Sequence, residues 1–149
     1  MIARVDRLAV AGALVAIAGL GIAVYLTIAH YAHAPLACVT TGPIDCAAVT
    51  SSSYSLVPGT DVPITLVGIA FFGLSGTFFA LAAGGAEPAW LPSLHFGIAA
   101  LALLAVLYLV YAEIVVINRV CEWCTLVHVL VLATFLITLR RVQTALAAV

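Results

Sequence analysis

The chain has 149 residues, of which 66% are apolar and only 7% are charged. Soluble domains carry about 25% charged residues, so this composition excludes an ordinary soluble domain and indicates a protein that lies in lipid. The net charge is −1 and the five basic residues are spread along the chain, which excludes the continuous basic surface that nucleic-acid binding requires.

Four apolar stretches, each with at most one charged residue, are long enough to cross a bilayer. A hydrocarbon core of about 30 Å needs about 20 apolar residues in a helix. The sequence therefore predicts an all-α membrane protein, a bundle of four transmembrane helices at residues 8–30, 63–83, 91–116 and 121–139. A polar loop at 31–62 follows the first span, and a glycine-rich turn at 84–88 follows the second. We expect residues 1–149 to form this single integral membrane domain.

Basic residues near the chain ends set the expected orientation. Four arginines flank the first and last spans: Arg4, Arg7, Arg140 and Arg141. Such residues favour the cytoplasmic side, and an even number of spans places both termini there. We therefore expect a multi-pass protein of the plasma (inner) membrane, with the loop at 31–62 and the segment 118–124 on the extracytoplasmic face.

A cleaved secretory signal is the alternative for the amino end. Arg4 and Arg7, an apolar run and the triplet Ala-His-Ala at 32–34 follow one another as they do in such signals. The apolar run at 8–30 has 23 residues, whereas a signal core has about 7 to 15. Cleavage would also leave three spans, with the two ends of the mature chain on opposite faces. We therefore favour a retained span.

Cysteines gather on the predicted outer face, at Cys38, Cys46, Cys121 and Cys124. That face is an oxidising compartment, so the placement favours redox chemistry. Cys121 and Cys124 form a CxxC pair at the start of a helix, on one side of it and within the Cα separation of a disulfide. Cys38 and Cys46 bracket seven residues with a Gly-Pro turn at 42–43, so a bridge between them would close a small mobile loop.

The start of the fourth span favours a thiolate at Cys121. Unsatisfied N–H groups and the helix dipole stabilise negative charge there, and Arg119 adds to this effect. Glu122 works against it. We expect the sum to lower the pKa of Cys121.

Other uses of the four cysteines stay open at this point. A structural zinc site could take four thiolates, although zinc ligands usually come in tighter pairs than Cys38 and Cys46. Two inert structural disulfides are a second alternative. From another function class, the thiols could be the soft ligands of a metal-binding or metal-transporting membrane protein.

Read in order, these features resemble the vitamin K epoxide reductase family, in particular its bacterial homologues. The resemblance covers about residues 8–141. Its elements are the outer pair Cys38 and Cys46, the serine cluster at 51–53, Pro63 at the entry to span two, and the CxxC at 121–124. Many bacterial members carry a fused thioredoxin-like domain after the last span. This chain has none before Val149, so the resemblance is to a stand-alone form.

The resemblance implies a membrane thiol:quinone oxidoreductase that supports disulfide bond formation. Cys38 would take electrons from a separate thioredoxin-like or DsbA-like extracytoplasmic protein. Cys46 would pass them to Cys121 through a transient interloop disulfide, and Cys124 would face the quinone, ubiquinone or menaquinone. The same resemblance predicts redox-active cysteines at the extracytoplasmic face.

Several residues are candidates for quinone binding by position. Ser52 falls where the family places a serine near the quinone, although a cap or turn role explains it equally well. The asparagine and tyrosine that family members often place there are replaced by Ile64 and His128. His128 lies one turn beyond the second CxxC cysteine, where its ring N–H is placed to donate to a quinone oxygen, or to a neighbouring helix. Thr65 is a weak substitute for the asparagine, and Trp123 is a candidate to line the pocket.

Other residues inside the spans receive simpler interpretations. We expect Glu113, near the outer end of span three, to pair with Arg119; snorkelling and proton transfer to the quinone are the alternatives. Glycines in the first two spans predict close helix contacts: Gly12, Gly19, Gly73 and Gly76.

Two related enzymes compete with this interpretation. The DsbB-type quinone-linked oxidase also has four spans and two cysteine pairs, but its CxxC lies in the first outer loop. Here the CxxC comes second. Direct reduction of an epoxide or naphthoquinone, as in animal members of the resembling family, is the other alternative, and nothing in the spans selects such a substrate.

Overall fold

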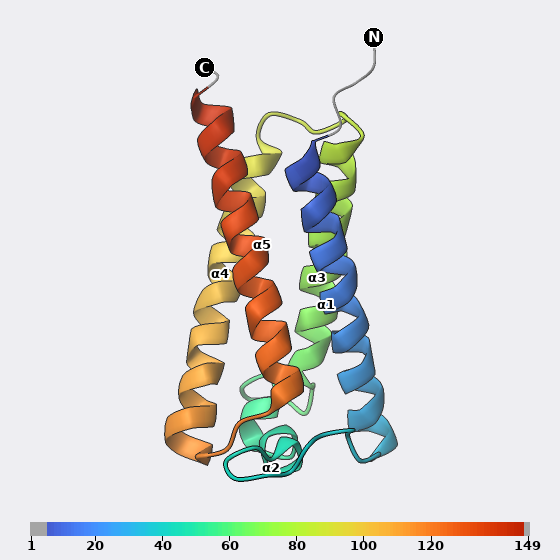
Figure 1. Cartoon of the computed structure of the whole chain (residues 1–149), viewed down its shortest axis with the longest axis vertical. Helices are drawn as coiled ribbons and strands as arrows, with labels where there is room; N and C mark the ends of the chain where they lie inside the picture. Colours follow the sequence, from blue (N-terminus) through green and yellow to red (C-terminus); the bar gives the residue numbers. More distant parts are fainter. Residues whose placement is uncertain (1–5, 148–149) are drawn as a thin grey trace.

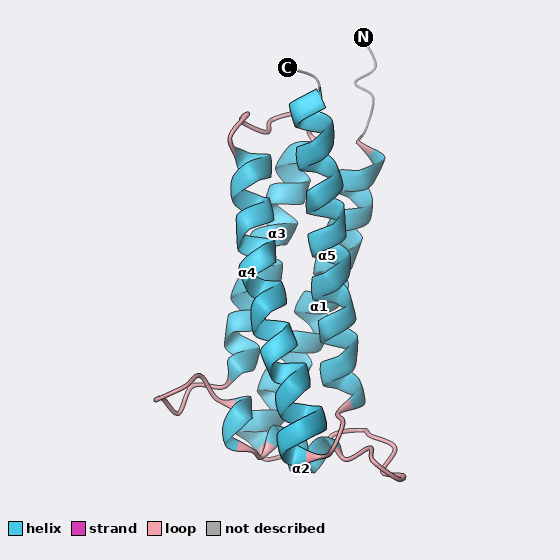
Figure 2. Ribbon diagram, turned by 90° about the vertical axis from the view of Figure 1, so that its left-hand side faces the viewer, coloured by secondary structure: helices cyan, strands magenta, loops and turns pink. Residues whose placement is uncertain are grey.

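The structure is a computed structural model that describes residues 6–147. It consists mainly of apolar helices, whose backbone hydrogen bonds are satisfied within each helix, as the interior of a bilayer requires. Four helices in this range are long and apolar enough to cross a membrane (Figures 1 and 2). They are α1 (Arg7–Ala32), α3 (Ile64–Ala83), α4 (Leu91–Tyr111), which continues into the π-helix η2 (Ala112–Ile117), and α5 (Glu122–Ala147). The predicted all-α bundle of four transmembrane helices is confirmed.

Two short helices lie between α1 and α3: α2 (Cys46–Thr50) and the 3₁₀ turn η1 (Ser53–Ser55). Figure 1 shows the start of α1 and the end of α5 at one end of the bundle, here called the terminal end. The segment with α2 lies at the opposite end, here called the loop end. The two ends of the described chain therefore lie on one side, as an even number of spans requires.

A buried ion cluster fixes the terminal end. Arg141 is only 8% exposed, and its guanidinium donates to both carboxylate oxygens of Glu87, at 2.9 and 2.6 Å. It also contacts Asp6 at 3.3 Å, and Asp6 caps α1 by accepting from the backbone N–H groups of Leu8 and Ala9. The cluster thus ties together the start of α1, the turn before α4 and the last turns of α5.

Helix α5 runs to Ala147, past the predicted end of the last span at 139, and that span boundary stays a prediction. Arg141, in this part of α5, is buried and paired. A buried arginine is tolerated there because the carboxylates of Glu87 and Asp6 compensate its charge. Arg4, which was expected to flank the first span, lies outside the described residues.

Small residues allow α1 and α3 to approach closely. Gly12 and Gly19 of α1 face the rings of Phe79 and Phe72 of α3, and a Cβ added at Gly12 would come within 2.5 Å of the Phe79 ring. The predicted contact role of these two glycines is confirmed, in line with the small-residue interfaces of membrane helices. The prediction for Gly73 was wrong, because a Cβ there would meet nothing within 4 Å.

Packing is uneven around the bundle. α1 packs along α3 and α5, and α5 packs along α4, whereas α3 and α4 contact each other only sparsely. A core of Phe71, Phe72, Ala99, Val106 and Val131 fills the middle of the bundle. Toward the loop end the sparse α3–α4 contact leaves room for the cavity described below.

The α1–α3 contact generates a stability prediction. Replacing Gly19→Ala places a methyl group against the Phe72 ring, so we expect the free energy of unfolding to fall by about 1–3 kcal/mol. Gly21→Ala on the same helix is the matched control, because its Cβ would meet nothing within 4 Å. We expect the control to be neutral or up to about 1 kcal/mol more stable.

Thermal unfolding in detergent, followed by circular dichroism, checks this prediction. Equal melting temperatures for the two variants would mean that α1 and α3 do not pack as described.

Candidate active site

The loop between α1 and α3 folds across the loop end of the bundle and is fastened to the segment before α5. The backbone N–H of Val120 donates to the carbonyl of Pro43 at 2.9 Å, and the N–H of Asp45 donates to the carbonyl of Val120 at 3.0 Å. Ile44 and Val120 form a parallel bridge. These bonds bring the segment around the outer cysteine pair against the residue that precedes the CxxC.

The outer cysteine pair forms a disulfide. Cys38 and Cys46 are bonded, with their Cα atoms 6.2 Å apart. Asp45 caps α2 by accepting from the N–H of Ala48 at 3.0 Å, so Cys46 is the first residue of that helix and is 1% exposed. Cys38 is half-buried. An attacking thiol would therefore meet the Cys38 sulfur first.

The CxxC pair carries free thiols at the start of α5. Cys121 is fully buried, Cys124 is half-buried, and the N–H of Cys124 donates to the Cys121 Sγ at 3.2 Å. The hydrogen bond from the Cys124 thiol lowers the pKa of Cys121, helped by the N–H groups of Cys124 and Trp123. Burial and the charge of Glu113 oppose this shift without reversing it. The predicted direction is confirmed, although the cation Arg119 is not among its causes.

Both pairs belong to one buried cluster at the loop end. Cys46, Val49 and Cys121 form its centre, and Cys38 and Cys124 pack against it. The buried member of each pair thus lies in the interior of the cluster, and the less buried members lie at its margins. Cys46 of the disulfide and Cys121 of the CxxC thus share one buried cluster, the juxtaposition that thiol–disulfide exchange between the pairs would need.

The two middle residues of the CxxC hold the outer disulfide loop. Glu122 Oε1 accepts from the N–H of Val39 at 3.2 Å, and Trp123 Nε1 donates to the carbonyl of Ala37 at 2.7 Å. The Trp123 ring packs on Tyr25, with centroids 5.1 Å apart, and the Tyr25 hydroxyl accepts from the N–H of Ala37 at 3.1 Å. We call Tyr25, Glu122 and Trp123 the loop clamp. The Glu122 carboxylate also lies within 4.8 Å of the sulfurs of the outer disulfide.

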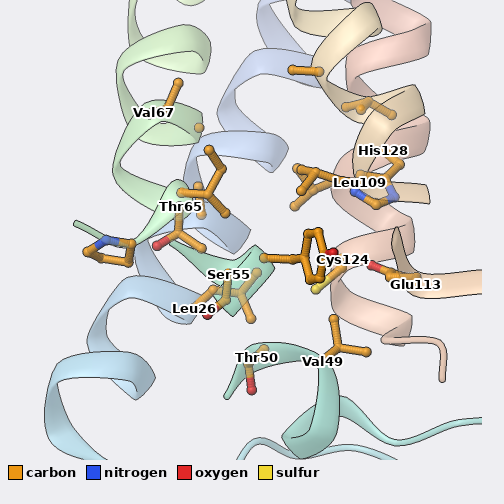
Figure 3. A pocket seen from close by; sticks show the side chains of 18 of the residues that line it. Leu26, Val49, Thr50, Ser55, Thr65, Val67, Leu109, Glu113, Cys124 and His128 are labelled. Atoms are coloured by element: carbon orange, nitrogen blue, oxygen red, sulfur yellow. The ribbon is translucent and has the colours of Figure 1, made fainter. Parts of the chain in front are cut away.

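An apolar cavity of about 170 Å³ opens beside Cys124. Its walls come from α1, α3, α4, η2, α5 and the loop residues 49–55. Figure 3 shows Cys124 and Glu113 next to each other on one wall, His128 one turn further along α5, and Thr65 on the facing wall. An apolar slot with a few polar groups beside a reactive thiol fits a flat apolar redox ligand with carbonyl oxygens.

Most of the predicted binding residues line this cavity. It brings together Cys124, Ser52, Thr65 and His128. Their contact with a quinone stays a prediction. Ser52 donates to the carbonyl of Val49 at 2.7 Å, which agrees with the alternative turn role. Trp123 was expected at this pocket, but it does not line it; the indole faces the outer loop as part of the loop clamp.

The predicted pairing of Glu113 with Arg119 was wrong. Glu113 is 6% exposed, lines the cavity, and its Oε2 accepts from the N–H of Cys121 at 3.4 Å. It was expected to pair with Arg119, but the Arg119 guanidinium instead donates to the carbonyl of Asn118 at 3.0 Å. The physical reason is the turn after η2: Asn118 has a positive φ of 54°, and the Arg119 N–H bonds to the Glu113 carbonyl at 3.0 Å.

Tyr54 and His30 also line the cavity and were not singled out from the sequence. Neither carried a local signal, because one lies in a polar loop and the other at the end of a span.

The bonding state of the cysteines bears on the alternatives left open above. A thiolate is the form that binds zinc, and a disulfide removes two of the four thiolates that a structural zinc site would need. Two inert disulfides do not describe the site either, because Cys121 and Cys124 carry free thiols. The arrangement instead has an oxidised pair and a reduced pair in one cluster.

Comparison with known proteins supports the resemblance. The model of the vitamin K epoxide reductase family matches residues 10–139. No curated protein matches the chain.

The loop clamp generates a prediction about the outer disulfide. Replacing Trp123→Phe keeps an aromatic ring on Tyr25 but removes the hydrogen bond to Ala37. Such a bond contributes about 0.5–1.5 kcal/mol, so we expect dithiothreitol to reduce the Cys38–Cys46 bond about two- to tenfold faster. Timed trapping of the released thiols with a maleimide mass tag measures the rate.

Trp90→Phe is the matched control, because Trp90 is exposed and lies at the terminal end. It should leave the rate unchanged. If Trp123→Phe behaved like this control, the loop would not be held by the clamp.

Proposed function

The chain belongs to the vitamin K epoxide reductase family, and from this premise we propose that it is a membrane thiol:quinone oxidoreductase that supports disulfide bond formation outside the cytoplasm. Family membership makes it a membrane thiol–disulfide oxidoreductase that works with a redox partner. We further propose that electrons pass from the partner to Cys38 and Cys46, then to the CxxC pair, and finally to a quinone. The observation that carries it is the single buried cluster in which the outer disulfide and the reduced CxxC meet.

Electrons enter at the outer pair. A thiolate of a separate thioredoxin-like or DsbA-like protein attacks the Cys38 sulfur, which is more exposed than that of Cys46. The Cys38–Cys46 bond breaks, and the second thiol of the partner then releases the partner in its oxidised form. Both outer cysteines are left as thiols, and the partner has lost two electrons and two protons.

Electrons then move inward by exchange. The Cys46 thiolate attacks Cys121 of the oxidised CxxC, and Cys124 leaves as a thiolate. Cys38 next attacks Cys46, which restores the outer disulfide and frees Cys121. The lowered pKa of Cys121 supports this step, because a sulfur with a low pKa is a good leaving group. The outer disulfide and reduced CxxC of the structure correspond to the state reached here.

The last step returns the CxxC to its oxidised form. Cys121 and Cys124 lose two electrons and two protons as their S–S bond forms, and a quinone takes up both to become a quinol. Quinones are the electron acceptors of this family. The cavity supports a quinone here because apolar walls surround Cys124, with His128 placed to donate its ring N–H and Ser52 and Thr65 as further polar groups. The quinone, ubiquinone or menaquinone, would enter from the bilayer between α3 and α4, where the packing is sparse.

We place the protein in the plasma (inner) membrane with both termini cytoplasmic and the loop end extracytoplasmic. The basic residues at the terminal end support this orientation, since Arg7 and Arg140 flank α1 and α5 there. In this proposal, residues 1–149 act as one membrane domain with a partner protein in trans. The family match favours this enzyme over the DsbB type.

Replacing the CxxC cysteines tests the electron route. The purified protein in lipid nanodiscs is mixed with a reduced DsbA-like protein and a short-chain ubiquinone analogue, and quinone absorbance is followed. We expect Cys121→Ala and Cys124→Ala each to reduce turnover to the rate without protein, because the final disulfide cannot form. Gly21→Ala serves as the active control.

Cys38→Ala separates the two pairs. We expect this variant, reduced beforehand, to give one turnover of quinone but no continued oxidation of the partner protein. Sustained turnover by Cys124→Ala would show that electrons reach the quinone by another route.

A further inference from the structure

Among the polar groups of the cavity, one buried acid has no role in the electron route. We propose that Glu113 is the proton-transfer residue of quinone reduction: its carboxylate accepts the protons of the Cys121 and Cys124 thiols as their disulfide forms and delivers them to the quinone oxygens. This inference rests on the function proposed above and assigns to a single side chain a step that the exchange chemistry leaves open.

The position of Glu113 meets the geometric requirement. It is the second residue of η2, the π-helix after α4, is 6% exposed, and lines the same cavity as Cys124. Its Oε2 accepts from the N–H of Cys121 at 3.4 Å, and Figure 3 shows its carboxylate beside the Cys124 sulfur. Oε1 has no hydrogen-bond partner within residues 6–147. One carboxylate oxygen is therefore anchored at the CxxC, and the other is available for a proton.

A structural role alone does not account for an acid at this position. Its one hydrogen bond to Cys121 caps the start of α5, and a neutral glutamine oxygen would accept the same bond. Ion pairs of the described residues involve Arg141 at the terminal end, so no cation offsets the burial of the Glu113 carboxylate. An unpaired acid inside a membrane protein is costly and usually functional. Single-turn π-helices are also frequent at functional sites.

Protons and electrons balance in the proposed step. The thiols of Cys121 and Cys124 lose two electrons and two protons, and the quinone gains both. Glu113 accepts one thiol proton, gives it to a quinone oxygen, and returns to the carboxylate form. The same cycle moves the second proton. His128, one turn further along α5, lines the same cavity and keeps its ring N–H as a hydrogen-bond donor.

Other titratable groups face the same space and must be separated from Glu113. Cys124 and His128 come from α5, Tyr54 from the loop, and His30 from α1, while Cys121, just before α5, feels the charge of Glu113. A protonated Glu113 cannot accept a thiol proton, so quinone reduction should slow as the pH falls through the titration of Glu113. The pH dependence of the quinone reduction rate that is due to Glu113 is the part that disappears in the Glu113→Gln variant.

Glu113→Gln is the decisive variant, because the amide keeps the cap on Cys121 but cannot carry a proton. The protein is reduced with dithiothreitol, desalted, and mixed with a short-chain ubiquinone analogue in a stopped-flow instrument. We expect the single-turnover rate of quinone reduction to fall about 10²- to 10⁴-fold, the range of general acid–base catalysis. The acidic limb of the pH profile should vanish, while the melting temperature and the exchange with a reduced DsbA-like protein stay as in the unmodified protein.

Two further variants keep the test independent of folding. Glu113→Asp should recover part of the rate, and Glu113→Ala should be rescued by added formate, which supplies a small carboxylate. Asp61→Asn, the same acid-to-amide change at an exposed loop residue, is the matched control and should leave the rate unchanged.

Outcomes for Glu113 and for the enzyme itself are distinguishable. If the unmodified protein reduces quinone and Glu113→Gln does so at the same rate with the same pH profile, Glu113 is only a helix cap. If the unmodified protein does not reduce quinone at all, the proposed function fails first.

Discussion

Two backbone hydrogen bonds at Val120 hold the redox site together. They tie the loop that carries Cys38 and Cys46 to the residue that precedes Cys121, so sulfurs from distant parts of the chain share one buried cluster. Each bond pairs a backbone donor with a backbone acceptor, which satisfies polar groups that the folded loop partly covers. Both bonds lie on the backbone and not on the sulfurs. The outer pair can therefore open and close while the loop keeps its place beside the CxxC.

The two ends of the bundle serve different physical purposes. At the terminal end, Arg141, Glu87 and Asp6 lock three segments with buried ion pairs, and along the bundle Gly12 and Gly19 allow α1 to press against α3. At the loop end, the sparse contact between α3 and α4 leaves an apolar cavity instead of a closed core. The ion cluster and the close helix packing thus lie away from the cavity and the cysteines.

The four helices and the gathering of the cysteines at one end of the bundle could be predicted from sequence, because lipid imposes long apolar runs and the order of the spans fixes which loops share an end. The errors share one cause: a local pattern does not say what a side chain meets. Trp123 looked like a pocket residue and clamps the loop, and Glu113 looked like the partner of Arg119, which instead bonds to the Asn118 carbonyl. The positive φ of Asn118, which turns Arg119 away, has no signature in the composition of the spans.

The proposed electron route requires that the sulfurs of Cys46 and Cys121 come into contact, and a disulfide cross-link between them tests this contact most directly. In the double variant Cys38→Ala with Cys124→Ala, only the two buried cysteines remain. Mild oxidation in nanodiscs followed by digestion and mass spectrometry should give one intramolecular disulfide between the peptides that contain Cys46 and Cys121. Two free thiols after oxidation, or disulfides only between separate molecules, would contradict a site in which the outer pair hands electrons to the CxxC.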